Sequence, residues 1–273
     1  MTRKSKAVLN FIPIAFKHYK QLFKSLMAFT EDNMAKDIVN QYTNGRGLPY
    51  VDILQILPEI DETVKDFTFL SYTSRVSDIA FIKAVAKSFK NCDYLEIGCF
   101  RGESLINILP NTSSAVSLSL SKTEMKEMNI PDEFIAPESI LVTPNDKLTQ
   151  IYHNSLTFDY TKLNRKFDLI FIDGDHSTEA VKIDTANAFN LLKDENSVII
   201  WHDFGNNYSE QRHDVIAGAL LGAPKDKHPF IYRVTNTLCG IYTSKKLQTL
   251  PQDTNLIMPS KLFDVSLKSK KIE

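Results

Sequence analysis

The sequence is short of cysteine, of net charge and of long apolar runs. Its three cysteines, Cys92, Cys99 and Cys239, form an odd set without metal-ligand spacing, which argues against a disulfide framework and favours a reducing cytoplasm. The 32 lysines and arginines balance 33 acids, so a net charge of −1 gives no reason to expect nucleic acid as a partner. The apolar run at 8–16 is too short to span a membrane and is broken by Pro13.

The first 30 residues carry basic side chains and no acid, since the first acid is Glu31. No small-residue cleavage site follows the apolar run, so we do not expect a signal peptide. Apolar residues recur at helical spacing from about Phe16 to Tyr42. This helix could lie on an anionic membrane surface, or its apolar face could dock on the main domain, which we favour. The sequence therefore predicts a helical cap at 1–70 that shapes the substrate pocket.

A strand, a glycine loop and a helix are predicted at 94–109. The loop glycines, Gly98 and Gly102, would let a ligand approach the main chain, and amides at the start of the helix would face that ligand. Glu96 stands at the carboxyl end of the strand, where open α/β sheets bind ligands. A dinucleotide site is disfavoured because Phe100 replaces the second glycine of its fingerprint.

Two later apolar strands, at 169–172 and 197–201, each end in polar residues. Fully apolar runs of this length are typical of central parallel strands. Because the carboxyl ends of parallel strands meet at one edge of a sheet, we expect these polar residues to lie together. They are Asp173, His176, His202 and Asp203.

Several local signals fix the remaining elements. Ser77-Asp78 are good N-cap residues for a helix, Ser121 and Glu124 form a capping box, and Ser177 caps a further helix. The stretch 131–148 holds three prolines and is predicted to be a loop insertion. The lysine-rich segment 246–273 is predicted to be a surface tail.

The glycine loop and the later strand ends resemble class I S-adenosylmethionine (SAM)-dependent methyltransferases. The pattern Glu-Ile-Gly-x-Phe-x-Gly-x-Ser at 96–104 and Ile-Asp-Gly-Asp-His at 172–176 is similar to a branch of O-methyltransferases acting on sugars of macrolide antibiotics. The resemblance covers roughly 75–245 and implies a SAM-binding domain at 71–245. It also implies a Rossmann-like, doubly wound α/β fold. Its mostly parallel seven-stranded sheet would end in a closing antiparallel hairpin at 230–243.

The same resemblance implies which residues contact SAM. The family usually has an acid for the ribose hydroxyls at the end of the next strand, where this chain has Ser119, a weaker partner. Asn154 could contact the adenine amino group, or it could be a turn residue before Ser155. The implied cofactor residues are Glu96, Gly98, Phe100, Gly102, Ser104, Ser119, Asn154, Ser155 and Asp173.

Three roles are open for the polar residues of the later strands. His176 could act as general base toward an acceptor hydroxyl. Alternatively Asp173, His202 and Asp203 could bind a divalent metal such as Mg²⁺, although a histidine is a less typical ligand for that ion. Two converging carboxylates without a cation would repel, so we lean toward the metal. Both histidines could also be structural.

Three classes of function remain. The first is O-methylation of a hydroxyl on a sugar, glycan precursor or other small molecule. The second is a metal-dependent hydroxylase, and the third is a non-catalytic module that binds SAM or a nucleotide. Fold alone does not decide among them. The expected partners are a small-molecule or glycan acceptor, a membrane surface at the N-terminus and a second copy of the chain.

Overall fold

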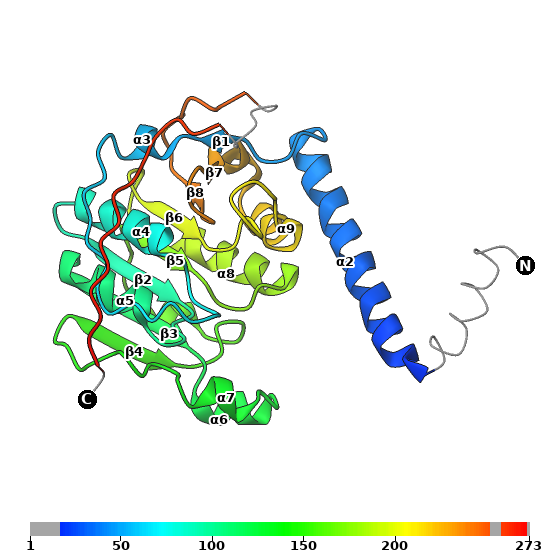
Figure 1. Cartoon of the computed structure of the whole chain (residues 1–273), viewed down its shortest axis with the longest axis horizontal. Coiled ribbons are helices and arrows are strands. Elements are labelled where there is room, and N and C mark those ends of the chain that lie inside the picture. The colour runs from blue at the N-terminus through cyan, green and yellow to red at the C-terminus, as the bar shows by residue number, and fades with distance from the viewer. Residues whose placement is uncertain (1–16, 252–257, 272–273) are drawn as a thin grey trace, which may run out of the picture.

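The computed structural model describes residues 17–251 and 258–271, which are built around one eight-stranded sheet (Figure 1). The strands are β1 (Tyr50–Val51), β2 (Asp93–Ile97), β3 (Ser114–Ser119), β4 (Leu148–Tyr152), β5 (Leu169–Ile172), β6 (Val198–Trp201), β7 (Ile231–Val234) and β8 (Gly240–Tyr242). Their spatial order is β1-β7-β8-β6-β5-β2-β3-β4. Only β8 runs antiparallel to its neighbours, β6 and β7. The predicted α/β fold with a closing hairpin is confirmed.

The prediction of seven strands was wrong by one strand. The additional strand is β1, which pairs in parallel with β7 and aligns Tyr50 with Arg233. Its Val51 is fully buried, and the Val51 carbonyl accepts from the amide of Thr235. A strand of two residues is too short to show any periodicity in the sequence. Part of the expected helical cap is therefore built into the sheet.

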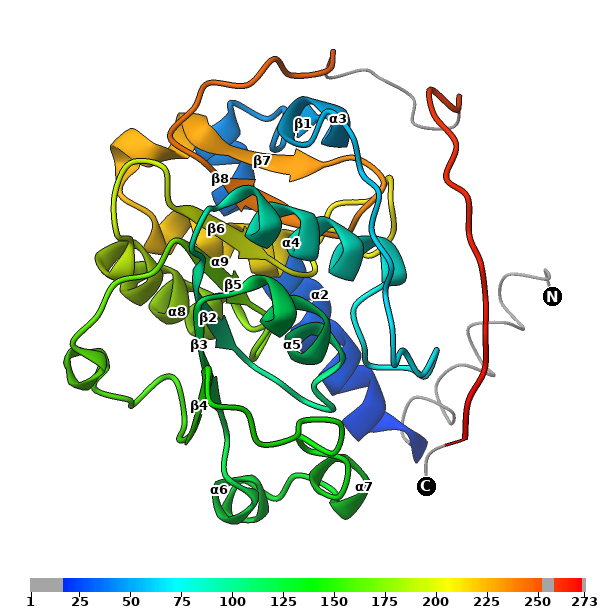
Figure 2. The same ribbon diagram turned by 90° about the vertical axis from the view of Figure 1, so that its left-hand side faces the viewer.

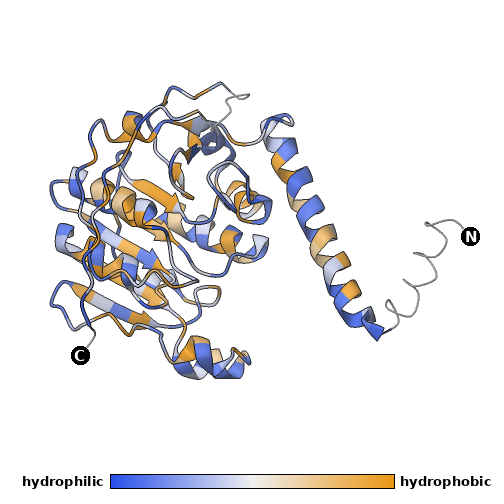
Figure 3. Ribbon diagram, in the orientation of Figure 1, coloured by the Kyte–Doolittle hydropathy of each residue, from blue (hydrophilic) through white to orange (hydrophobic). Residues whose placement is uncertain are grey.

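Helices cover both faces of the sheet (Figure 2). Strand side chains alternate between the faces, so each strand contributes to two separate cores. On one face, Tyr94 and Phe171 pack with α4 and α5, and on the other, Ile170 and Trp201 pack with α8 and α9. Figure 3 shows the apolar central strands between these layers. The four helices are α4 (Val76–Ser88), α5 (Glu103–Ile108), α8 (Thr178–Leu191) and α9 (His213–Gly222).

The N-terminal helix α2 (Tyr19–Thr43) docks on the sheet domain only through its C-terminal half, and its other end lies clear of the body (Figure 1). Ala35 and Val39 are buried, and this part of the helix contacts α9. Large apolar side chains in the first half are exposed, among them Phe23 at 64% and Leu26 at 60%. No helix in the described ranges is long and apolar enough to cross a membrane. The basic residues before Lys17 lie outside the described residues.

The segment between α3 (Ile53–Ile56) and α4 is irregular, and it leads the chain toward the carboxyl edge of the sheet. The amide of Lys65 donates to Asn107 on α5, and the hydroxyl of Ser74 donates to Asp173. The predicted cap at Ser77-Asp78 is wrong, because α4 begins at Val76. The capping box at Ser121 and the cap at Ser177 are confirmed.

The remaining elements are short. The stretch predicted to be a loop insertion contains one turn of helix, α7, and the exposed residues 258–271 run along the surface. Lys261 ties this tail to Asp52 through an ion pair of 2.8 Å. These elements are α6 (Lys122–Glu127), α7 (Asp132–Ile135) and the 3-10 turns η1 (Leu109–Asn111), η2 (Tyr160–Leu163) and η3 (Lys225–Phe230).

Candidate active site

Four predicted residues meet at the carboxyl edge of the sheet. Asp173 and His176 follow β5, while His202 and Asp203 follow β6, and the two strands are paired in parallel. Nδ1 of His202 lies 3.2 Å from Oδ1 of Asp173 and 3.1 Å from Oδ1 of Asp203. Nε2 of His176 lies 3.5 Å from Oδ1 of Asp173 and 3.4 Å from Oδ2 of Asp203. The structure therefore forms one cluster of two imidazoles and two carboxylates.

His202 is enclosed by carboxylates on both sides of its ring. Its side chain is 7% exposed, and its Nε2 lies 3.0 Å from Oδ2 of the fully buried Asp78 on α4. Burial opposes a charge on the ring, but Asp173, Asp203 and Asp78 outweigh it and raise the pKa of His202 well above its usual value. His202 as an imidazolium thus supplies a positive charge between Asp173 and Asp203.

Asp78 and Arg212 complete the cluster, and sequence reasoning missed both. The Asp78 carboxylate accepts from His202 and from the amides of Arg75 and Leu238, so it anchors α4 to the site. Asp78 lies near the start of a helix, so the sequence indicated a capping residue and gave no sign of its contact with His202. Arg212, just before α9, donates to Oδ2 of Asp203 at 2.5 Å. The repulsion that favoured a metal is therefore offset by protein cations.

His176 is the most exposed member of the cluster, at 37% of its side chain. Its Nε2 is buried between Asp173 and Asp203, at ion-pair distance but without a well-aligned hydrogen bond. Burial lowers the pKa of His176, while the two carboxylates raise it more strongly, so the net direction is upward. The other ring nitrogen, Nδ1, does not face these carboxylates and is available to the hydroxyl of a methyl-acceptor substrate.

The donor atoms differ from the predicted magnesium set. Asp173, His176 and His202 offer ligand atoms within 4.8 Å of one another, and this described group does not include Asp203. Two imidazoles and one carboxylate do not fit the all-oxygen shell that Mg²⁺ prefers. They resemble the two-histidine, one-carboxylate set of non-haem iron. The cluster is thus a candidate for either acid-base chemistry or a softer metal.

Gly98 holds the glycine loop against the end of β5. Its φ is +90°, and a Cβ added there would lie 2.1 Å from the backbone oxygen of Asp173. The sequence indicated that a side chain at this position would block a ligand. The structure shows that it would also clash with the protein backbone. The contact makes the glycine loop and the polar cluster neighbours.

Replacing Gly98 with alanine is expected to destabilise the fold by about 3 kcal/mol or more, through left-handed strain plus overpacking. Gly45→Ala is the matched control, because Gly45 also has a positive φ, +74°, and has no atom within 4 Å of the added Cβ. The control should lose only about 1 kcal/mol. Urea unfolding measures both, and equal losses would show that the contact with Asp173 is unimportant.

Glu96 is buried beneath the glycine loop and bonds to Ser104, two residues after Gly102. Strand alternation places it on the face covered by α4 and α5, where it is fully buried. Its carboxyl group bonds to the hydroxyls of Tyr94 and Ser104, each at 2.6 Å. Burial raises its pKa to about 8, so Glu96 is mostly protonated at neutral pH. The Ser104 hydroxyl thus donates to Glu96, and the role of both residues toward the cofactor stays a prediction.

The remaining predicted cofactor residues surround the ends of β2, β3 and β4. Phe100 adopts a positive φ of 40°, and its ring centroid lies 6.5 Å from that of Phe134 on α7. The side-chain oxygen of Asn154 accepts from the amide of Leu156 at 2.9 Å. This contact is typical of a turn residue, one of the two alternatives that the sequence left open, and a contact of Asn154 with adenine stays a prediction. Gly102, with φ +92°, is the N-cap of α5.

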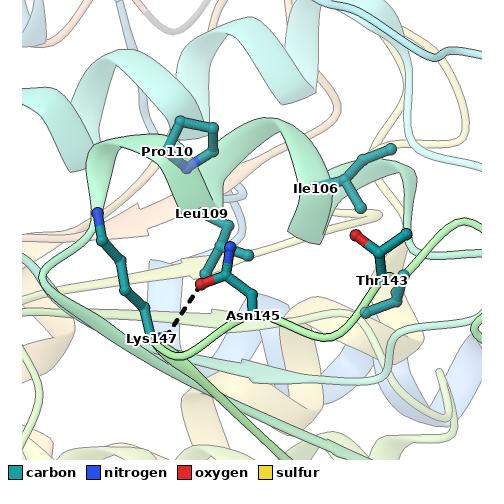
Figure 4. Close-up of a pocket in the computed structure, with 7 residues that line it drawn as sticks. Ile106, Leu109, Pro110, Thr143, Asn145 and Lys147 are labelled. Atoms are coloured by element: carbon teal, nitrogen blue, oxygen red, sulfur yellow. Dashed lines mark hydrogen bonds between the residues drawn. The ribbon is translucent and has the colours of Figure 1, made fainter.

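A separate pocket of about 280 Å³ lies between the end of α5, η1 and the segment before β4 (Figure 4). Asn145 accepts from the amide of Lys147, and the Lys147 ammonium donates to the backbone of Thr112. The polar groups of its lining thus bond to the protein. Its lining residues are Ile106, Leu109, Pro110, Val142, Thr143, Asn145 and Lys147.

One family of known proteins matches the segment that carries the polar cluster. Residues 95–204 match a family model described as a methyltransferase domain. The match contains the glycine loop and both strand ends that carry the cluster. A search of curated proteins finds no similar sequence. The enzyme class expected from the sequence is confirmed at this level, while the macrolide-sugar branch stays a prediction.

Several solved structures are also similar. An O-methyltransferase from Bacillus cereus in complex with SAH has 19% identity over 56% of this chain and 70% of that chain, with a TM-score of 0.40. A SAH-bound Podospora anserina methyltransferase has 18% identity over 66% of this chain and 83% of that chain, with a TM-score of 0.42. The O-methyltransferase TomG from Streptomyces achromogenes, in complex with SAM, has 13% identity over 63% of this chain and 82% of that chain, with a TM-score of 0.39. TM-scores this low support no further conclusion about the chain.

Proposed function

We propose that this chain transfers the methyl group of SAM to a hydroxyl of a sugar, glycan precursor or other small molecule. The observation that carries the proposal is the contact between the glycine loop and the polar cluster, at Gly98 and Asp173. A cofactor over the loop and an acceptor at the cluster would then be neighbours. The methyltransferase domain at 95–204 spans both parts.

The residues at the mouth of the glycine loop fit SAM. The loop presents backbone at two glycines of positive φ, Gly98 and Gly102, where a side chain would block a close approach. The buried Glu138 carboxylate stands beside the loop without an ion-pair partner among the described residues, and it could accept from a hydroxylated ligand. SAM, when bound, supplies an electrophilic methyl group for in-line displacement.

In this proposal His176 removes the acceptor proton. Nδ1 is the ring nitrogen not buried against the carboxylates, so it takes the hydroxyl proton as the oxygen attacks. The imidazolium that forms is stabilised by Asp173 and Asp203, which already lie within 3.5 Å of Nε2. His202 and Arg212 hold those two carboxylates in place. The cluster thus works as a positioned base with a fixed counter-charge.

Calorimetric titration with SAH tests the cofactor half of the proposal. We expect saturable binding of one SAH per chain, and competition by SAM. ATP and NAD⁺ should not compete, because Phe100 leaves no room for a pyrophosphate against the loop. A chain that binds NAD⁺ but not SAH would overturn the proposed function.

A further inference from the structure

Glu138 occupies a position that sequence reasoning did not single out. It follows α7, it is only 8% exposed, and its carboxylate accepts from the hydroxyl of Ser139 at 3.5 Å. The hydroxyl of Ser119, at the end of β3, is close enough to lower the pKa of Glu138. The next residues pair with the glycine loop: the amide of Ser139 donates to the carbonyl of Phe100, and Leu141 donates to that of Arg101. Glu138 therefore lies between the loop after β2 and the end of β3.

This carboxylate has little compensation for its burial. No lysine, arginine or histidine among the described residues lies within ion-pair distance of it, and Lys122 acts only at longer range. Burial raises the pKa of Glu138 to about 7, and the contacts with Ser119 and Ser139 lower it only in part. The carboxylate can accept about four hydrogen bonds, so acceptor capacity remains for a ligand.

The backbone beside Glu138 is strained on both sides of its contact with the glycine loop. Phe100 and Ser139 are non-glycine residues with φ of 40° and 57°, and a hydrogen bond joins them. Such left-handed residues cost about 1 kcal/mol or more each and persist where surrounding structure holds them. The hydrogen bond between Ser139 and Phe100 thus fixes the backbone next to Glu138 against the glycine loop.

We propose that Glu138 binds the ribose hydroxyls of SAM, from the segment after α7, in place of an acid at Ser119. The inference rests on the proposed function and adds a residue to it. Two neighbouring hydroxyls can both donate to one carboxylate in charge-assisted hydrogen bonds. Ser119 then acts as a positioning residue that holds the carboxylate.

The test combines a variant with a ligand that lacks the groups it would bind. Glu138→Gln keeps the shape of the side chain and removes its charge. SAH binding, measured by calorimetry at about pH 8, should weaken about 10- to 100-fold. The 2′,3′-dideoxy analogue of SAH should bind the parent about as weakly as SAH binds the variant. It should bind the parent and the variant nearly equally. Glu133→Gln, on the exposed face of α7, is the matched control and should bind SAH like the parent.

The outcomes separate two failures. If the parent does not bind SAH, the proposed function fails. If the parent binds SAH and Glu138→Gln binds it equally well, or if the variant weakens SAH and the dideoxy analogue by the same factor, only the role of Glu138 fails. Circular dichroism checks the fold of the variant. If the variant does not fold, the two ligands still test the role on the parent, because equal binding of SAH and its dideoxy analogue would contradict a contact between Glu138 and the hydroxyls.

The pH dependence of binding gives an independent readout. The carboxylate form of Glu138 grows as pH rises through about 7, so affinity of the parent for SAH should rise between about pH 6 and 8. The charged and titratable neighbours are Lys122, on α6, and Cys99, whose pKa burial raises, so the thiol stays neutral in this range. The rise should be absent in Glu138→Gln. An equal rise in the variant would contradict the assignment.

Discussion

Replacing His176 with alanine is expected to lower the rate of methyl transfer about 10²- to 10⁴-fold, the usual contribution of a positioned general base. Affinity for SAH should stay within about twofold of the parent, because His176 lies at the polar cluster and not beside Glu138 and the end of β3. Its side chain is 37% exposed, so its loss removes no core packing. The measurement is the initial rate of SAH release with a saturating acceptor.

His18→Ala is the control for this variant, because His18 is exposed at the start of α2 and its ring bonds to Gln21 on the helix surface, away from the polar cluster. It should retain the full rate. A His176→Ala enzyme with the parental rate would remove the base from the mechanism and leave the cluster a structural role. A variant that also lost SAH binding would instead place His176 in the cofactor site.

The second large effect concerns Asp203 and metal dependence. The Asp203→Asn variant should lose about 10- to 100-fold in rate, since the neutral amide no longer stabilises the imidazolium of His176. Its sensitivity to chelators should equal that of the parent. We expect both to keep their rate within about twofold in excess EDTA, because His202 and Arg212 already neutralise the two carboxylates.

Loss of activity in EDTA, restored by added metal, would contradict this and assign Asp173, His176 and His202 to a metal. Restoration by Fe²⁺ alone, with consumption of oxygen, would favour the hydroxylase alternative. Restoration by Mg²⁺ would return the site to the set first expected, Asp173, His202 and Asp203. Each outcome therefore names a different chemistry for the same cluster.

Much of the sheet and its polar edge was predictable because burial leaves a strong pattern. Strands β5 and β6 are runs of four fully buried residues, and parallel pairing brings their ends together whatever surrounds them. The prediction that Asp173, His176, His202 and Asp203 meet needed only that topology. The Ser121 capping box was equally local, since both partners lie within four residues.

The parts that escaped prediction depend on contacts between distant segments. Asp78 meets His202 across 124 positions, and no spacing in the sequence signals that pair. Glu138 sits in a stretch whose prolines indicated a loop, and only the fold shows that this loop returns to Phe100. Likewise β1 has two residues and depends on β7 for its identity as a strand.

The N-terminal helix shows the limit of a pattern read without its surroundings. Its apolar spacing favoured a docked face, yet Phe23 and Leu26 are exposed while Val39, near the other end, is buried. Periodicity correctly indicated a helix, but the position of α9 decides which turns of that helix are buried. Whether the exposed half contacts a membrane surface or a second copy stays a prediction.

Methyl transfer itself tests the central claim most directly. The chain is incubated with SAM carrying a deuterated methyl group and with a panel of hydroxylated sugars and nucleotide sugars, and the products are analysed by mass spectrometry and NMR. The account predicts an acceptor that gains one deuterated methyl group on oxygen, with release of an equal amount of SAH and no product from His176→Ala. Tight binding of SAM without transfer to any acceptor, or transfer to nitrogen or carbon that His176→Ala retains, would contradict it.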